Sequence, residues 1–93
     1  MKSMIGHKFA LKWEMFGLPL GSIGYAFSEY PDFDDPMELG VQIIFQNGNY
    51  DGFGVEEQNM FLTDLGMDER YANYNFTNVM QVTRDFNRGY WKW

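Results

Sequence analysis

The chain has 93 residues, 45% of them hydrophobic and 22% charged, which predicts one folded domain over residues 1–93 and excludes a globally disordered chain. It contains no cysteine and a single histidine, so disulfides, thiolate metal sites and zinc sites built on several histidines are excluded. No apolar run is long enough to cross a membrane or to form a signal peptide. We therefore expect a cytoplasmic protein without a membrane partner, in which aromatic residues, 19% of the chain, supply much of the core.

The charged residues are unevenly distributed along the chain. The formal net charge is −6, yet residues 13–69 contain twelve acidic residues and no Lys or Arg, whereas both ends are basic. Two interpretations remain open: an acidic surface that opposes aggregation, and an acidic face that attracts a basic partner through its electrostatic field. Either one disfavours direct nucleic-acid binding, because neutralising phosphates requires clustered Lys and Arg.

Alternating apolar residues predict two strands in the first third of the chain. Residues 8–15 alternate between large apolar side chains and polar or small ones, and the glycines and proline of residues 17–21 then break the pattern. Residues 23–28 predict a second strand with a face of small side chains, against which another element can pack closely. His7, just before the first strand, is expected at the surface.

Residues 30–37 contain two prolines and three aspartates, and we expect them to form a loop. Its carboxylates permit a solvated loop, a Ca²⁺ or Mg²⁺ site, paired acid and base catalysts, or a contact with a basic partner. Phe33 lies among them, either as a core residue or as the apolar anchor of an interface. The candidate partner-binding residues are Asp32, Phe33, Asp34 and Asp35 of this loop and Glu38, which follows it.

Residues 39–55 carry the clearest hairpin pattern of the chain. An alternating strand over 39–45 leads into Asn47-Gly48, which is typical of a two-residue type I′ turn and places Phe45 opposite Tyr50. Ile44, Phe53 and Val55 then share the other face, which must be covered. Residues 47–52 also resemble part of a calcium loop, but Gln58 stands where the bidentate Glu is required. We therefore expect neither a metal nor a cofactor.

The remaining residues predict a short helix and one ambiguous segment. Residues 56–65 favour a helix that begins with two glutamates and is stopped by Gly66. Over residues 74–86 the valines and Thr83 favour a strand. The alternative is a helix capped by Asn78, with Val79, Val82, Phe86 and Tyr90 buried and Gly89 at its end.

Together these elements predict an α+β fold. Connections between successive strands are short, which favours antiparallel pairing, because parallel strands need a long crossover. We expect a curved, mainly antiparallel sheet of four or five strands with one short helix. The alternative is a small five-stranded SH3-like barrel.

The chain ends in Trp91-Lys92-Trp93, which is a second candidate site. In an extended chain Trp91 and Trp93 point the same way. They either fold back over an open face of the sheet or anchor a protein interface, where Trp is enriched.

The sequence offers no enzyme site, because no nucleophile-elbow pattern surrounds any serine and His7 stands alone. In size and charge sign the chain is similar to phage and mobile-element anti-defence proteins, including anti-CRISPR proteins and DNA mimics. That similarity implies an inhibitor, a monomer or homodimer, that blocks a basic nucleic-acid-binding surface of a partner protein in the host cytoplasm. The alternatives are a structural or assembly subunit of an oligomer or phage particle, and a small-ligand sensor with an aromatic-lined pocket.

Overall fold

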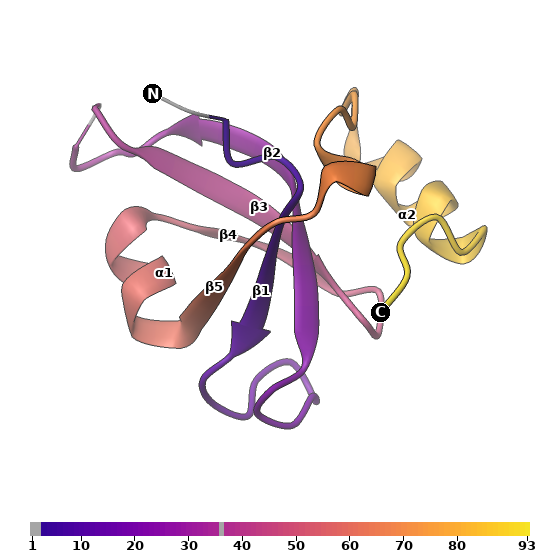
Figure 1. Cartoon of the computed structure of the whole chain (residues 1–93), viewed down its shortest axis with the longest axis horizontal. Helices are drawn as coiled ribbons and strands as arrows, with labels where there is room; N and C mark the ends of the chain where they lie inside the picture. The colour runs from indigo at the N-terminus through magenta and orange to yellow at the C-terminus, as the bar shows by residue number, and fades with distance from the viewer. Residues whose placement is uncertain (1–2, 36) are drawn as a thin grey trace.

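The computed structural model describes residues 3–35 and 37–93; Lys2 and Pro36, which belong to the basic N-terminus and to the predicted loop, lie outside the described residues. Its elements confirm the α+β class and the antiparallel sheet (Figure 1). In chain order they are β1 (His7–Leu11), β2 (Ile23–Pro31), β3 (Leu39–Phe45), β4 (Tyr50–Phe53), α1 (Val55–Phe61), β5 (Leu62–Met67), the 3-10 helix η1 (Glu69–Tyr71) and α2 (Val79–Asn87).

The five strands form one sheet in the order β4-β3-β2-β1-β5. Every neighbouring pair is antiparallel, and the last strand returns to pair with the first, with Leu11 opposite Leu62. Helix α1 joins the two edge strands, β4 and β5 (Figure 1). In the described part of the chain these edges do not pair with each other, so the sheet curves without closing into the alternative barrel.

Both faces of the sheet are buried, because each one carries large apolar side chains. Loop residues 15–18 and α1 contribute partly buried side chains over one face, whereas η1, α2 and the C-terminal residues pack over the other. Burying a Phe, Leu or Ile side chain contributes about 1.5–3 kcal/mol. The first core consists of Phe9, Leu11, Ala26, Val41, Ile43, Phe45, Phe53 and Leu62. The second core consists of Tyr25, Phe27, Ile44, Tyr71, Tyr74, Val82 and Trp91.

The hairpin at Asn47-Gly48 is confirmed, but its predicted register is wrong by one residue. The Gly48 N–H donates to the Phe45 carbonyl at 2.9 Å, and the Phe45 N–H donates to the Asn49 carbonyl at 2.8 Å. These bonds close a three-residue loop in which Gly48 has a φ of 87° and Asn47 does not have a positive φ, so the turn is not type I′. Tyr50 therefore lies opposite Ile44.

This change of register reassigns the side chains that follow the turn. Phe53 lies opposite Val41 and joins the first core, instead of sharing a face with Ile44. Tyr50 lies on the other side of the sheet, where its ring is 6.3 Å from that of Phe27. A shift of one residue exchanges the two faces of a strand, which is why the turn type decides the composition of both cores.

The predicted helix over residues 56–65 is wrong in its second half. Helix α1 ends at Phe61, and the chain continues directly into β5. Pairing with β1 satisfies backbone groups that the sheet edge would otherwise leave open, and it buries Leu62 in the first core. His7, expected at the surface, instead begins β1 and lies half-buried, with Nδ1 3.0 Å from Oδ1 of Asp64.

The favoured strand over residues 74–86 is also wrong, and the alternative helix is the one that forms. Asn78 caps α2, because its side chain accepts a hydrogen bond from the Gln81 N–H at 3.0 Å. Gly89, with a φ of 74°, follows its end. Val82 is fully buried and Phe86 partly so, and these residues, four apart, attach the helix to the second core.

We predict that Gly48→Val destabilises the protein by about 1–2 kcal/mol, because a β-branched residue is forced to a positive φ. The added Cβ would also stand 3.0 Å from Cε2 of Phe86. Equilibrium denaturation measures the cost. Gly17→Val is the matched control for backbone strain alone, because Gly17 has a φ of 75° and no atom within 4 Å of an added Cβ. An unchanged midpoint for Gly48→Val would contradict the turn assignment.

Candidate protein-binding site

The acidic loop is held between the ends of β2 and β3. Pro31 pairs with Leu39, and the Asp32 N–H donates to the Glu38 carbonyl at 2.9 Å. The Glu38 N–H in turn donates to the Asp35 carbonyl at 3.0 Å. These bonds give the loop a defined conformation, which is a requirement for a specific contact surface.

Phe33 points away from the protein. Its side chain is 97% exposed, so it does not fill the core. All nine phenylalanines lie in the described part of the chain, and Phe33 is the one that is exposed. Asp34, Asp35 and Glu38 are exposed beside it, and Asp32 is half-buried. The structure thus places the five predicted loop residues on one projection, with the aromatic ring among the carboxylates.

An acidic hollow of about 340 Å³ separates this loop from the beginning of α1. Two exposed helix residues, Glu56 and Glu57, line it together with Asp32 and Asp34. The loop and the helix approach closely at Gly54, where an added Cβ would stand 2.8 Å from Oδ1 of Asp32. Glu56 and Glu57 were not among the residues predicted for this site. Their position at a helix start within the acidic stretch of residues 13–69 does not reveal that this start faces the loop.

Tyr30 also lines this hollow, and the neighbouring carboxylates affect the pKa of its hydroxyl. Burial raises the pKa of Tyr30, and the negative charges of Glu57, Asp32 and Asp51 raise it further. In residues 3–35 and 37–93 the contacts between basic and acidic side chains are His7 with Asp64 and Arg70 with Asp68, so no basic side chain of these residues pairs with a carboxylate of the hollow. A negative potential directed outward attracts a basic side chain.

The C-terminal tail lies far from the acidic loop, and the structure does not bring these two predicted sites together. In Figure 1 the β2–β3 connection and the C-terminus lie on opposite sides of the molecule. Trp91 is 2% exposed, and its ring is 5.1 Å from that of Tyr74. Trp93 is 39% exposed, and its ring is 5.5 Å from that of Tyr25. The tail therefore covers the second core. A partner contact by Trp91 stays a prediction that requires the tail to leave the sheet.

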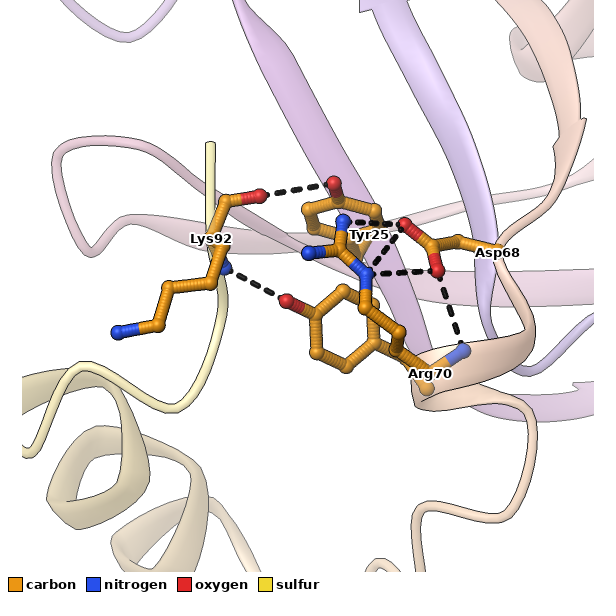
Figure 2. A network of polar contacts seen from close by, with 5 residues as sticks. Tyr25, Asp68, Arg70 and Lys92 are labelled. Atoms are coloured by element: carbon orange, nitrogen blue, oxygen red, sulfur yellow. Dashed lines mark hydrogen bonds and ion pairs between the residues drawn. The ribbon is translucent and has the colours of Figure 1, made fainter.

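Two buried tyrosines hold the tail by its backbone (Figure 2). The Tyr25 hydroxyl donates to the Lys92 carbonyl at 2.9 Å, and the Lys92 N–H donates to the Tyr71 hydroxyl at 2.7 Å. The two hydroxyls thus satisfy both backbone groups of one residue, as a neighbouring strand would do. We refer to Tyr25 and Tyr71 as the tyrosine clamp.

An ion pair lies beside the clamp. The Arg70 Nη2 donates to the Asp68 carboxylate at 2.7 Å, and the guanidinium carbon lies 5.0 Å from the centre of the Tyr71 ring (Figure 2). The hydrogen bonds from Arg70 hold the pKa of Asp68 below its usual range. Burial, followed by the negative charge of Asp68, raises the pKa of Tyr25. The Tyr25 hydroxyl therefore remains a protonated donor at neutral pH.

Comparison of the chain with known protein families, with curated proteins and with solved structures finds no match. In the residues that the structure describes, no group of three or more His, Asp or Glu side chains is arranged to hold a metal ion. Within the same residues, no helix has the length and apolar character required to cross a membrane.

We predict that Tyr71→Phe costs about 1 kcal/mol and loosens the tail, because the Lys92 N–H loses its acceptor. Denaturation measures the stability, and hydrogen exchange at the Lys92 amide measures the loosening. Tyr90→Phe is the control: it removes a hydroxyl from the same aromatic cluster that makes no hydrogen bond to another described residue. Equal exchange at Lys92 in parent and Tyr71→Phe would contradict the clamp.

Acid titration tests the ion pair of Asp68. A carboxyl whose pKa is lowered in the folded state stabilises it at pH values above its ordinary pKa, and this contribution is lost as the pH falls through the folded pKa. Arg70→Gln should therefore raise the pKa of Asp68 and reduce stability at neutral pH, whereas in acid the difference in stability between parent and variant should become smaller. NMR titration and denaturation at several pH values measure both effects. A stability difference that persists unchanged in acid would contradict the assignment.

Proposed function

We propose that this protein is an acidic binding protein that inhibits a partner by covering a basic surface. The single observation that carries the proposal is Phe33, an exposed aromatic residue surrounded by carboxylates that no basic residue of the described chain neutralises. An apolar anchor within a charged rim is the common arrangement of an interface hot spot. The contact residues are Asp32, Phe33, Asp34, Asp35 and Glu38, and Glu56 and Glu57 extend the surface.

The chemistry of the partner follows from these groups. Carboxylates on a defined loop accept charge-assisted hydrogen bonds from Arg and Lys, as phosphate oxygens do. A surface that normally grips a nucleic-acid backbone carries such residues in clusters. An inhibitor of a nucleic-acid-binding protein, as in phage or mobile-element anti-defence, is the finer form of this proposal. It depends on charge and on the exposed ring, and it requires no enzymatic step.

The test compares variants in one affinity-capture experiment on host lysate, with quantitative identification of the retained proteins. Asp32→Asn/Asp34→Asn/Asp35→Asn and Phe33→Ala should each lose a protein that the parent retains, with nearly unchanged melting temperatures. The control is Glu14→Gln/Glu69→Gln, which removes two exposed acids elsewhere and should still retain that protein. Its counterpart in the loop is Asp34→Asn/Asp35→Asn, which removes the same number of charges. Equal capture by the parent, the triple Asn variant and Phe33→Ala would refute the proposal.

Kinetics with the captured partner separate the two contributions. Electrostatic attraction predicts that the parent's association rate falls as salt rises, and that the triple Asn variant associates more slowly and with less salt dependence. Phe33→Ala should instead accelerate dissociation by about tenfold or more, as expected for a hot-spot residue. If the triple Asn variant binds the partner normally at every salt concentration, the loop does not carry the interaction.

A further inference from the structure

A second surface, opposite in charge to the acidic loop, lies between α2 and β4. It is a groove of about 550 Å³, a volume typical of ligand-binding clefts. Tyr50 forms one wall, and the other consists of Met80 and Arg84 of α2 and of Arg88, which directly follows the helix. Residues 80, 84 and 88 follow one another at single-turn spacing on a face of α2 that turns away from Val82. We refer to this surface as the arginine groove.

The groove is apolar and basic at once. Met80 is 80% exposed, so its side chain is available to contact a group that enters the cleft. Among the residues that the structure describes, the charged ones that line the groove are Arg84 and Arg88. In the part of the chain that the structure describes, no carboxylate forms an ion pair with either one. The surface therefore suits an acidic segment that also carries an apolar side chain.

The chain itself carries such a segment. Phe33 is exposed between Asp32 and Asp34, and Asp35 follows it. In Figure 1 the β2–β3 connection and α2 lie at opposite ends of the long axis, so a single molecule cannot bring loop and groove together. We propose that the arginine groove binds residues 32–35 of a second copy of this chain. The Phe33 ring enters beside Tyr50 and Met80, and the aspartates pair with Arg84 and Arg88.

This contact joins two different surfaces. It permits either a reciprocal pair, in which each loop enters the other copy's groove, or a head-to-tail chain or ring. The inference goes beyond the proposed function and does not require a foreign partner. Charge complementarity orients the two copies, and the apolar anchor supplies the desolvated centre of the interface.

Oligomeric state is the first measurement. Sedimentation of the full chain over a wide range of protein concentration should show association that weakens as salt rises. Phe33→Ala and Arg84→Glu/Arg88→Glu should each weaken it by about tenfold or more. Lys92→Glu, a charge reversal at an exposed residue outside the groove, is the control and should associate as the parent does. A parent that stays monomeric at all concentrations overturns the inference.

A mixing experiment tests the pairing itself. Phe33→Ala keeps an intact groove, and Arg84→Glu/Arg88→Glu keeps an intact loop. Each should be largely monomeric alone, whereas their mixture should form a one-to-one complex through the remaining loop and groove. If the mixture does not associate, or if association survives in either variant alone, another surface such as an edge strand joins the copies and the inference is wrong.

The same variants test whether the groove binds phosphates instead, and whether self-association is independent of the foreign partner. A single-stranded DNA oligonucleotide that binds the parent as a monomer, and not Arg84→Glu/Arg88→Glu, would assign the groove to phosphates and overturn the inference. Arg84→Glu/Arg88→Glu should still capture the foreign partner, because its acidic loop is intact. Failure of self-association with partner capture intact would thus refute this inference alone, whereas the reverse result would refute only the proposed function.

Discussion

The structure depends on covering the second face of its sheet. Five strands in a 93-residue chain leave two apolar faces, and Met4, the loop of residues 15–18 and α1 pack over the first. The segment after β5 supplies Tyr71, Tyr74, Val82 and Trp91 to the other face. The tyrosine clamp fixes the end of that segment, because its two hydroxyls satisfy the N–H and carbonyl of Lys92 while Trp91 lies buried beside them. Trp91 thus belongs to the second core, although the tail contains no regular secondary structure.

The acidic loop differs from the tail because its aromatic residue, Phe33, is exposed. Aromatic side chains are the principal core material of the protein, and eight of its nine phenylalanines are at least partly buried. The hydrogen bonds that close the loop keep Phe33 away from either core. Exposing it therefore forgoes the burial energy that the other phenylalanines contribute. A single exposed apolar residue is ordinary, but one surrounded by unneutralised carboxylates has a defined chemical complement.

The sequence predicts the fold where local signals decide it. Alternation placed the strand over residues 39–45 correctly, and Asn47-Gly48 located the hairpin. Its register was wrong because Gln46 also belongs to the loop, which the dipeptide alone does not reveal. β5 was missed because its pairing with β1 joins residues far apart in the chain. The helix after Asn78 carried its cap and its glycine stop, but β propensity outweighed them, and propensity yields to packing on a core.

The candidate sites were likewise predictable only in part from local sequence. The sequence shows the acidic composition of the loop. The exposure of Phe33 depends on how β2 and β3 end, which the sequence does not show. Glu56 and Glu57 join this surface only because the fold places the start of α1 beside the loop. The arginine groove could not be predicted, because it requires the helical form of residues 79–87 and the position of that helix beside β4. The fold thus converts an uneven charge sequence into two complementary surfaces at opposite ends of the molecule.

If the acidic loop binds both a foreign partner and a second copy, the two binding equilibria are linked. Residues 32–35 would contact both the foreign partner and a second copy, so the two events would compete for one loop. A ligand that binds only the free loop shifts the association equilibrium toward monomers by an amount set by its concentration and affinity. Self-association would then store the acidic surface in a covered form, and a basic partner of higher affinity would release it. The same exposed ring and carboxylates would govern both equilibria, because no other described phenylalanine is available at the surface.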